Sequence, residues 1–195
     1  MNFLLTGGAG YIGSHAALSL LDAGHNVHII DDLSTGNESL IPKNAFFTKC
    51  NINDEEVISE LIKSNSFDLL MHFAGFIQVE ESVKYPQKYF DNNTENATKL
   101  FETCKNNGLN KIVFSSTAAA YGSVSENKLI DENTNLNPQN PYAESKIKTE
   151  NFLFENKDDY KFIILRYFNV AGADKKLRSG QISKRSTHLI KILSE

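Results

Sequence analysis

The stretch NFLLTGGAGYIGS, residues 2–14, decides the fold of this 195-residue chain. Its apolar start, Phe3–Leu5, predicts a short buried strand, and the glycines after it predict a tight turn that leads into a helix. A strand, a glycine loop and a helix N-terminus in this order offer backbone N–H groups and a helix dipole to a pyrophosphate. The residues that we expect to line this site are Gly7, Gly10, Tyr11, Ile12 and Gly13.

A second apolar run, Val27–Ile30, predicts the next strand, and the acidic pair Asp31 and Asp32 closes it. Asp31 follows Gly13 by 18 residues, which is the place of the acidic residue in the dinucleotide-binding pattern. A carboxylate there accepts hydrogen bonds from ribose hydroxyls and repels a 2′-phosphate, and no arginine lies nearby to reverse that preference. We therefore expect NAD rather than NADP as the cofactor. Asp32 is expected either to bond within its own loop or to share the role of Asp31.

The remainder of the chain alternates short apolar runs with amphipathic stretches. We expect further strands at residues 45–47, 69–73, 112–114 and 162–165, and helices after Asp54, over Pro86–Asn106, around Tyr142–Phe154 and within residues 187–193. Near-continuous apolar strands separated by helices predict a parallel sheet. The predicted fold class is α/β, a Rossmann-like doubly wound parallel sheet with helices on both faces and ligands outside the carboxyl ends of the strands. We assign residues 1–171 to a NAD-binding Rossmann domain and residues 172–195 to the start of an incomplete C-terminal substrate domain.

Composition and charge argue against several classes of function. A net charge of −4 gives no general reason to expect nucleic acid as a partner, and the basic residues within 175–185 are read either as a solvated loop or as a phosphate contact. Cys50 and Cys104 lie far apart, so we expect neither a disulfide framework nor a metal site. The N-terminus does not fit a signal peptide, and no apolar run approaches the ~20 residues of a membrane-spanning helix. We therefore expect a cytoplasmic protein without a membrane partner.

The candidate chemistry lies further along the chain, where Tyr142 and Lys146 place a phenol and an ammonium at positions i and i+4 of a helix. The spacing alone favours an ordinary surface pair, but the pair follows the fifth strand and Thr117, at the carboxyl edge of the sheet. A tyrosine has an ordinary pKa of ~10, so it needs a nearby cation such as Lys146 to act as a base near neutral pH. Lys146 is also expected to hydrogen-bond the nicotinamide ribose, and Thr117 to orient a substrate alcohol or relay its proton. These three residues suit the oxidation of a secondary alcohol by hydride transfer.

With these motifs in order, the sequence resembles the extended short-chain dehydrogenase/reductase family, and within it the nucleotide-sugar 4-epimerases. The resemblance covers nearly the whole chain. It is carried by Thr6–Gly13, Phe73–Gly75, Asp91–Asn93, Phe114–Ala118, Tyr121–Gly122, Pro141–Tyr142, Ser145–Lys146 and Leu165–Asn169. The last segment is particularly informative, because a plain buried strand does not explain Arg166 or Asn169.

The resemblance implies reversible 4-epimerisation of a UDP-hexose, UDP-glucose or UDP-galactose, by transient hydride transfer to bound NAD. Tyr142, as phenolate, would take the proton of the sugar 4-hydroxyl with help from Thr117, and hydride would return to the other face of the 4-keto sugar. The resemblance also implies that the cofactor is held by Asn51, Ile52, Phe73, Ala74, Gly75, Asn93, Ser115, Tyr142, Lys146 and Phe168. The implied substrate contacts are Thr117, Tyr142, Asn169, His188 and Leu189, and for His188 a position on a helix surface is an equal reading. A homodimer through the helices around residues 88–106 and 142–155 is implied on the same ground.

Several positions depart from the family pattern. Asn51 stands where the family usually has Asp, and Ile77 where some members carry a Lys on the cofactor. Ala118 and Ala119 replace the Asp-Glu pair of sugar-nucleotide dehydratases, so elimination of the 6-hydroxyl lacks its proton carriers. Members of the family also run well beyond 195 residues. Two alternatives therefore stay open: a non-catalytic NAD-binding fragment, and a 4-epimerase or reductase for another UDP-sugar such as UDP-N-acetylglucosamine.

Overall fold

A single parallel sheet organises the chain, which a computed structural model describes over residues 1–124, 129–182 and 189–194. Six strands pair in the order β3-β2-β1-β4-β5-β6, and every pairing is parallel. Their bounds are β1 Asn2–Thr6, β2 Asn26–Ile30, β3 Phe46–Thr48, β4 Leu69–His72, β5 Lys111–Ser115 and β6 Lys161–Leu165. The order reverses between β1 and β4, and ligands of doubly wound sheets bind at such a reversal. The predicted Rossmann-like fold is confirmed.

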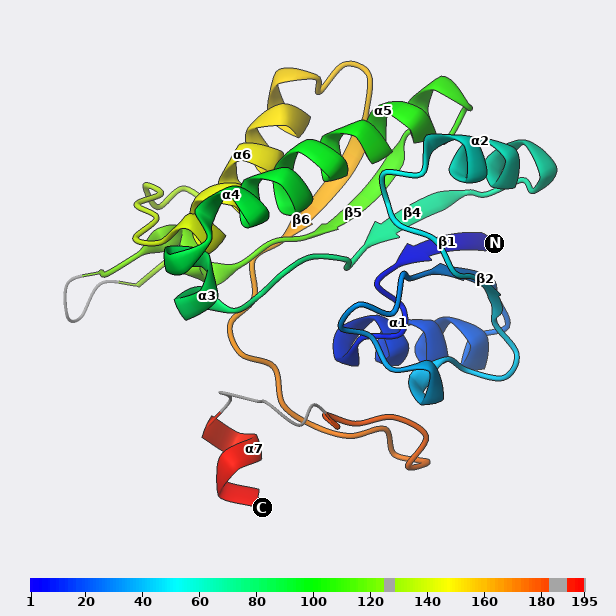
Figure 1. Cartoon of the computed structure of the whole chain (residues 1–195), viewed down its shortest axis with the longest axis horizontal. Coiled ribbons are helices and arrows are strands. Elements are labelled where there is room, and N and C mark those ends of the chain that lie inside the picture. Colours follow the sequence, from blue (N-terminus) through cyan, green and yellow to red (C-terminus); the bar gives the residue numbers. More distant parts are fainter. Residues whose placement is uncertain (125–128, 183–188, 195) are drawn as a thin grey trace.

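Helices cover both faces of this sheet (Figure 1). One face carries α1 (Tyr11–Asp22), and the other carries α2 (Glu55–Ser64), α5 (Ala97–Asn106) and α6 (Pro141–Glu155). Successive residues of a strand point to opposite faces, so Phe3 and Leu5 of β1 pack on the α1 side and Leu4 on the other. Because both sides are buried, β1 reads as a continuous apolar run rather than as an alternating one.

The connection between β4 and β5 differs from the prediction. Instead of one α-helix over Pro86–Asn106, the chain forms α4 (Pro86–Tyr89), a π-helical segment (Phe90–Asn96) and then α5. A short helix that the sequence did not predict, α3 (Val79–Lys84), precedes them. Its apolar residues Val79 and Val83 are 43% and 63% exposed, so α3 lacks the buried stripe that marks a helix in a sequence.

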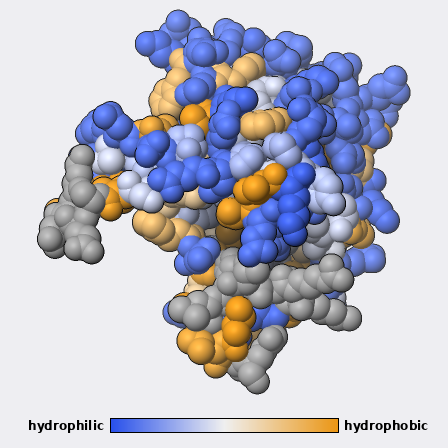
Figure 2. All heavy atoms as spheres, turned by 60° about the vertical axis from the view of Figure 1, so that its left-hand side comes forward, coloured by the Kyte–Doolittle hydropathy of each residue, from blue (hydrophilic) through white to orange (hydrophobic). Residues whose placement is uncertain are grey.

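Coverage of the sheet is uneven at the β6 edge. Ile163 of β6 is 60% exposed, and the described chain leaves β6 as a tether that runs away from the sheet toward α7 (Leu189–Ser194) (Figure 1). Hydrophobic atoms gather near α7 at the lower end of the molecule in Figure 2. Ile190, Ile192 and Leu193 of α7 are 63%, 53% and 75% exposed.

Within the described residues, no helix is long and apolar enough to cross a membrane.

The start of α2 follows the sequence prediction closely. The carboxylate of Asp54, the N-cap residue, accepts a hydrogen bond from the backbone N–H of Val57 at 3.3 Å. Asp54→Ala leaves that N–H unpaired, so we expect it to lower the free energy of unfolding by about 1 kcal/mol. Urea denaturation of the two proteins measures the difference, with Asp158→Ala, in the exposed turn after α6, as the control that should change little. Equal stability of wild type and Asp54→Ala would contradict the capping role.

Candidate active site

The glycine loop between β1 and α1 packs directly against the end of β4. Gly7 has a φ of +71°, and a Cβ on it would lie 2.5 Å from the backbone nitrogen of Ala74. A Cβ on Gly13 would lie 2.2 Å from the carbonyl oxygen of Gly7. At the N-terminus of α1, the N-cap residue Gly10 supplies no side chain to cap the helix, and Ile12 lies half-buried in the first turn. The loop therefore combines a backbone cradle that only glycine fits with free helix N–H groups, which suits a pyrophosphate.

The acidic pair after β2 is held by hydrogen bonds. Asp31, 8% exposed, accepts from the backbone N–H of Ala9 at 3.0 Å and of Leu33 at 2.9 Å. Burial raises the pKa of Asp31, and the two N–H donors oppose that rise. Asp32 accepts from its own loop and from the side-chain amide of Asn51 at 2.8 Å. The structure thus joins Asp32 to Asn51 beyond the ends of β2 and β3, and Asp31 to the glycine loop.

The segment after β4 approaches α6 through the π-helical segment. Asn93, 1% exposed, accepts from the N–H of Phe76 and donates to its carbonyl oxygen, both at 2.9 Å. A Cβ on Gly75 would lie 3.1 Å from the amide oxygen of Asn93 and 3.1 Å from Lys146 Nζ. Single π-helical turns are frequent at functional sites, and this one brings Asn93 and Lys146 to the same glycine.

Tyr142 and Lys146 lie one helical turn apart on α6, as the sequence predicts. Thr117 hydrogen-bonds the Tyr142 side chain, and Thr117 itself accepts from the N–H of Ala119 at 3.1 Å. Burial raises the pKa of Tyr142, and the Thr117 hydrogen bond only partly opposes it. The Lys146 ammonium is directed at Gly75 and lies 5.0 Å over the Phe114 ring. Burial lowers the pKa of Lys146 to about 8.

The remaining predicted residues are distributed around this edge. Ile52 lies in the core, and Phe73 and Ala74 are half-buried beside the glycine loop. Ser115 forms a short hydrogen bond with the hydroxyl of Tyr167, a contact that the sequence did not indicate. Phe168 is 75% exposed and Asn169 is also exposed. Both residues follow β6, and neither is packed against Tyr142. Leu189 is the first residue of α7, and His188 lies outside the described residues.

Residues 172–182 return to α1, where they bond to its outer side. The Tyr11 hydroxyl donates to the carbonyl oxygen of Gly172 at 2.7 Å, and Ser14 hydrogen-bonds Ser179 at 2.7 Å. Arg178 and Lys176 form ion pairs with Asp22 at 2.7 and 3.2 Å. These two basic side chains therefore bind carboxylates in the structure, and Lys184 and Arg185 lie outside its described part.

A buried histidine lies beneath the site. His72 of β4 is 0% exposed, and its Nδ1 lies 2.6 Å from the Thr6 hydroxyl while its Nε2 has no hydrogen-bond partner. Burial and the charge of Lys146 lower its pKa to about 3. This histidine was missed in the sequence, because a histidine within an apolar strand cannot be told from any other core residue.

His72 should make the protein acid-sensitive. The unfolded chain protonates His72 near pH 6.5 and the folded chain only near pH 3, so the unfolded state binds the additional proton between these values. We expect this group to remove roughly 1.4 kcal/mol of stability per pH unit as the pH falls through that window. Denaturation of wild type and His72→Gln from pH 7 to pH 4 measures it: the variant should show the flatter pH dependence. Parallel curves for the two proteins would contradict the assignment.

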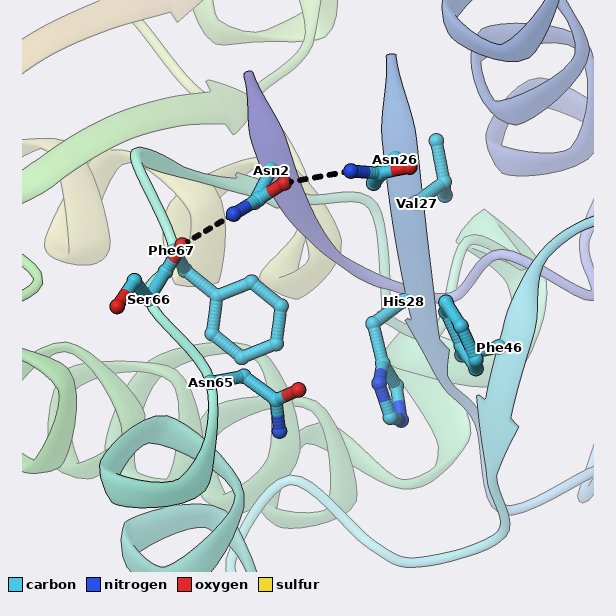
Figure 3. Close-up of a pocket in the computed structure, with 8 residues that line it drawn as sticks. All are labelled: Asn2, Asn26, Val27, His28, Phe46, Asn65, Ser66 and Phe67. Atoms are coloured by element: carbon cyan, nitrogen blue, oxygen red, sulfur yellow. Dashed lines mark hydrogen bonds between the residues drawn. The ribbon is translucent and has the colours of Figure 1, made fainter.

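A hollow of about 290 Å³ lies at the opposite, amino end of the strands (Figure 3). Asn2 donates to the Ser66 carbonyl oxygen at 2.7 Å and accepts from Asn26 at 2.9 Å across its floor. Its titratable residue, His28, is engaged with Thr48 at 2.8 Å. The hollow holds no nucleophile beside a base, so the chemistry belongs to the carboxyl edge. Among the described residues, no cluster of three or more His, Cys, Asp or Glu side chains could hold a metal ion.

Comparisons with known proteins agree with this geometry. The UDP-glucose 4-epimerase of Azospirillum brasilense is 45% identical over 191 residues, which cover 97% of this chain and 55% of that protein. A crystal structure of a UDP-glucose 4-epimerase has a TM-score of 0.95 at 37% identity and covers 100% of this chain and 59% of that one. The UDP-glucose 4-epimerase of Brucella ovis, solved in complex with NAD, gives 0.92 at 35% identity, with 97% and 58% covered.

The chain spans little more than half the length of these relatives. The family model for the NAD dependent epimerase/dehydratase family matches residues 3–194, almost the whole chain. The resemblance to nucleotide-sugar epimerases that the motifs carry is thereby confirmed. On this match, and with the parallel sheet and glycine loop in place, the chain belongs to the NAD dependent epimerase/dehydratase family.

Proposed function

We propose that this chain is the NAD-binding part of a nucleotide-sugar 4-epimerase that interconverts UDP-glucose and UDP-galactose. The observation that carries the proposal is that Thr117 hydrogen-bonds the Tyr142 side chain, while Lys146, one turn further along α6, points its ammonium at Gly75 after β4. A hydroxyl, a phenol and a buried ammonium at that edge suit the oxidation and re-reduction of one sugar carbon.

The residues present fit NAD. Gly7 and Gly13 let the loop pack against the backbone of Ala74 and of Gly7 itself, where a Cβ would collide, and the uncapped start of α1 follows this loop. We propose that Asp31 accepts the ribose hydroxyls, with Asp32 and Asn51 at the adenine side. When bound there, NAD would supply the hydride acceptor and the hydride that returns to the sugar.

The protein's own residues move the proton. Tyr142 removes it from the sugar 4-hydroxyl, and Thr117, whose oxygen already accepts from Ala119 N–H, directs its own proton to the phenol oxygen. Lys146 holds a positive charge in a site from which water is largely excluded, since it is 3% exposed. We propose that this charge stabilises the phenolate that forms during turnover, an interaction that is stronger in such surroundings than in water. Returning the proton to the product completes the cycle without net oxidation.

The same proposal assigns the rest of the chain. Residues 1–171 form the cofactor domain, and residues 172–195, with Asn169, His188 and Leu189 toward the substrate, begin the domain that binds the UDP-sugar. The docking of residues 172–182 on α1 supports a substrate domain that starts beside the cofactor. On family likeness, a second copy packs against α5 and α6, which light scattering of the purified protein can test.

The experiment is conversion of UDP-galactose to UDP-glucose in the presence of NAD. It is run with this chain and with the chain extended at Glu195 by the corresponding remainder of the Azospirillum brasilense relative. Turnover by either protein is the expected result, and turnover by the extended one alone would place the missing sugar contacts beyond residue 195. Failure of both, with NAD bound, would contradict the proposal in favour of a non-catalytic NAD-binding module.

A further inference from the structure

A buried charged network lies behind the catalytic residues. Glu150 of α6 is 0% exposed, and the Arg166 side chain that pairs with it is 15% exposed. Arg166 Nε lies 3.0 and 3.1 Å from the two carboxylate oxygens, and Nη2 donates to one of them. The Ser116 hydroxyl donates to the other oxygen through a short hydrogen bond. The carboxylate of Glu150 is therefore fixed from two sides.

This carboxylate connects the elements that carry the candidate chemistry. Glu150 lies on the same helix as Tyr142 and Lys146, and Ser116 is the chain neighbour of Thr117. Arg166 also donates to the Tyr121 hydroxyl at 3.0 Å, in the 3-10 helix (Ala118–Tyr121) that Thr117 caps. One side chain thus ties α6 to the end of β5 and to the segment after β6.

Such a network is expensive to bury. Removing a carboxylate and a guanidinium from water costs several kcal/mol per ion, and apolar residues of similar volume often stabilise a core as well or better. Its retention directly behind the site therefore needs a reason other than stability. The neighbouring charge that the Glu150 carboxylate stabilises is the Lys146 ammonium, one helical turn earlier on α6.

The surroundings of Lys146 offer little else to hold its charge. His72 faces it from β4 and is neutral, the Phe114 ring faces it from β5, and the amide of Asn93 from the π-helical segment. Tyr142, on its own helix, is raised in pKa and also neutral. Lys146 forms no salt bridge among the described residues, and the charge of Glu150 opposes the effect of burial on its pKa.

We propose that Glu150 is a positioning residue, which holds the positive charge of Lys146 and the register of α6 against Thr117, while Ser116 and Arg166 fix its carboxylate. Its role in turnover rests on the proposed function. The electrostatic part does not, because Lys146 has its charge whether or not the chain turns over a sugar.

The test is the titration of Lys146 followed by NMR of its ε-carbon in protein labelled at lysine, with Lys146→Met to assign the signal. Glu150→Gln keeps the shape and an acceptor for Ser116 but removes the charge, so the Lys146 midpoint should fall by roughly one pH unit. Glu150→Asp should recover part of the shift. The control is Glu144→Gln on the same helix, which breaks only the 3.3 Å surface pair with Lys148 and should leave the midpoint unchanged.

An unchanged midpoint in folded Glu150→Gln, or an equal shift in Glu144→Gln, would overturn the proposal. If Glu150→Gln does not fold, the double variant Glu150→Met/Arg166→Met removes both charges without leaving one unpaired. It should still lower the midpoint, by less than the single variant, and an unchanged value there would also overturn the proposal. Where turnover is measurable, the alkaline limb of its pH profile should move to lower pH with the midpoint. Absence of turnover with a shifted midpoint would count against the proposed function alone.

Discussion

Gly7→Ala is expected to weaken NAD binding severely and to raise the Kd for NAD at least about 100-fold. A residue with a side chain at φ +71° costs about 1–2 kcal/mol by conformation alone. Its Cβ would also stand 2.5 Å from Ala74 N and 2.7 Å from Phe73 C. Both are backbone atoms that cannot swing aside, so the loop must move away from β4, and overpacking of this kind costs a further 1–3 kcal/mol or so. A loss of about 2.7 kcal/mol in binding corresponds to the 100-fold change.

Gly24→Ala separates the close approach from the conformational strain. Gly24 has a similar φ of +79°, but a Cβ there meets nothing within 4 Å, and it follows α1 at the end away from the site. Gly24→Ala should lower the free energy of unfolding by the same conformational cost, about 1–2 kcal/mol, and should keep its affinity for NAD. Isothermal titration of the three proteins with NAD gives the comparison. Equal NAD affinities for wild type and Gly7→Ala, or equal losses of NAD affinity in the two variants, would contradict the role of the glycine loop in NAD binding.

Tyr142→Phe is expected to lower the rate of UDP-galactose conversion by about 10²–10⁴-fold, because the phenol oxygen is the group that takes the substrate proton. NAD affinity should change by no more than about fivefold, the equivalent of one hydrogen bond worth about 1 kcal/mol. The variant loses the hydrogen bond to Thr117 but keeps the ring that meets Tyr89 edge-on at 6.4 Å.

Tyr85→Phe is the matched control, since Tyr85 is 61% exposed on the connection between α3 and α4. It should keep both turnover and NAD affinity. Rates are measured with whichever protein, the chain or its extended form, shows turnover. Undiminished turnover by Tyr142→Phe would remove Tyr142 from the mechanism and leave Thr117 as the remaining hydroxyl at the site.

The parts of the fold that the sequence predicted are those in which local pattern and tertiary environment agree. The residues of β1 are buried on both sides, so their apolar run is visible without knowing what covers them. The turn at Gly7 and the carboxylate at the end of β2 were predicted for a similar reason, because both follow from residue types at a set spacing. These local constraints were enough to predict the sheet, the glycine loop and the placement of Tyr142 and Lys146 on one helix.

What the sequence concealed depends on distant partners. Lys146 and Glu150 at i and i+4 look like a surface pair, and only the fold shows both side chains buried and Glu150 paired with Arg166. The π-helical segment has the same composition as an ordinary helix, and its function of bringing Asn93 to Phe76 arises from packing. The spacing of Tyr142 and Lys146 along a helix likewise does not give the direction of the Lys146 ammonium, which the fold turns toward Gly75.

The central claim is that the glycine loop and Asp31 of this chain hold NAD for alcohol oxidation and re-reduction. The most direct measurement is the mass and fluorescence of the nucleotide released when the purified protein is denatured. We expect NAD, part of it in the reduced and fluorescent form, because a 4-epimerase retains its cofactor between turnovers. Release of NADP, or a purified protein that carries no dinucleotide and binds none when NAD is added, would contradict it.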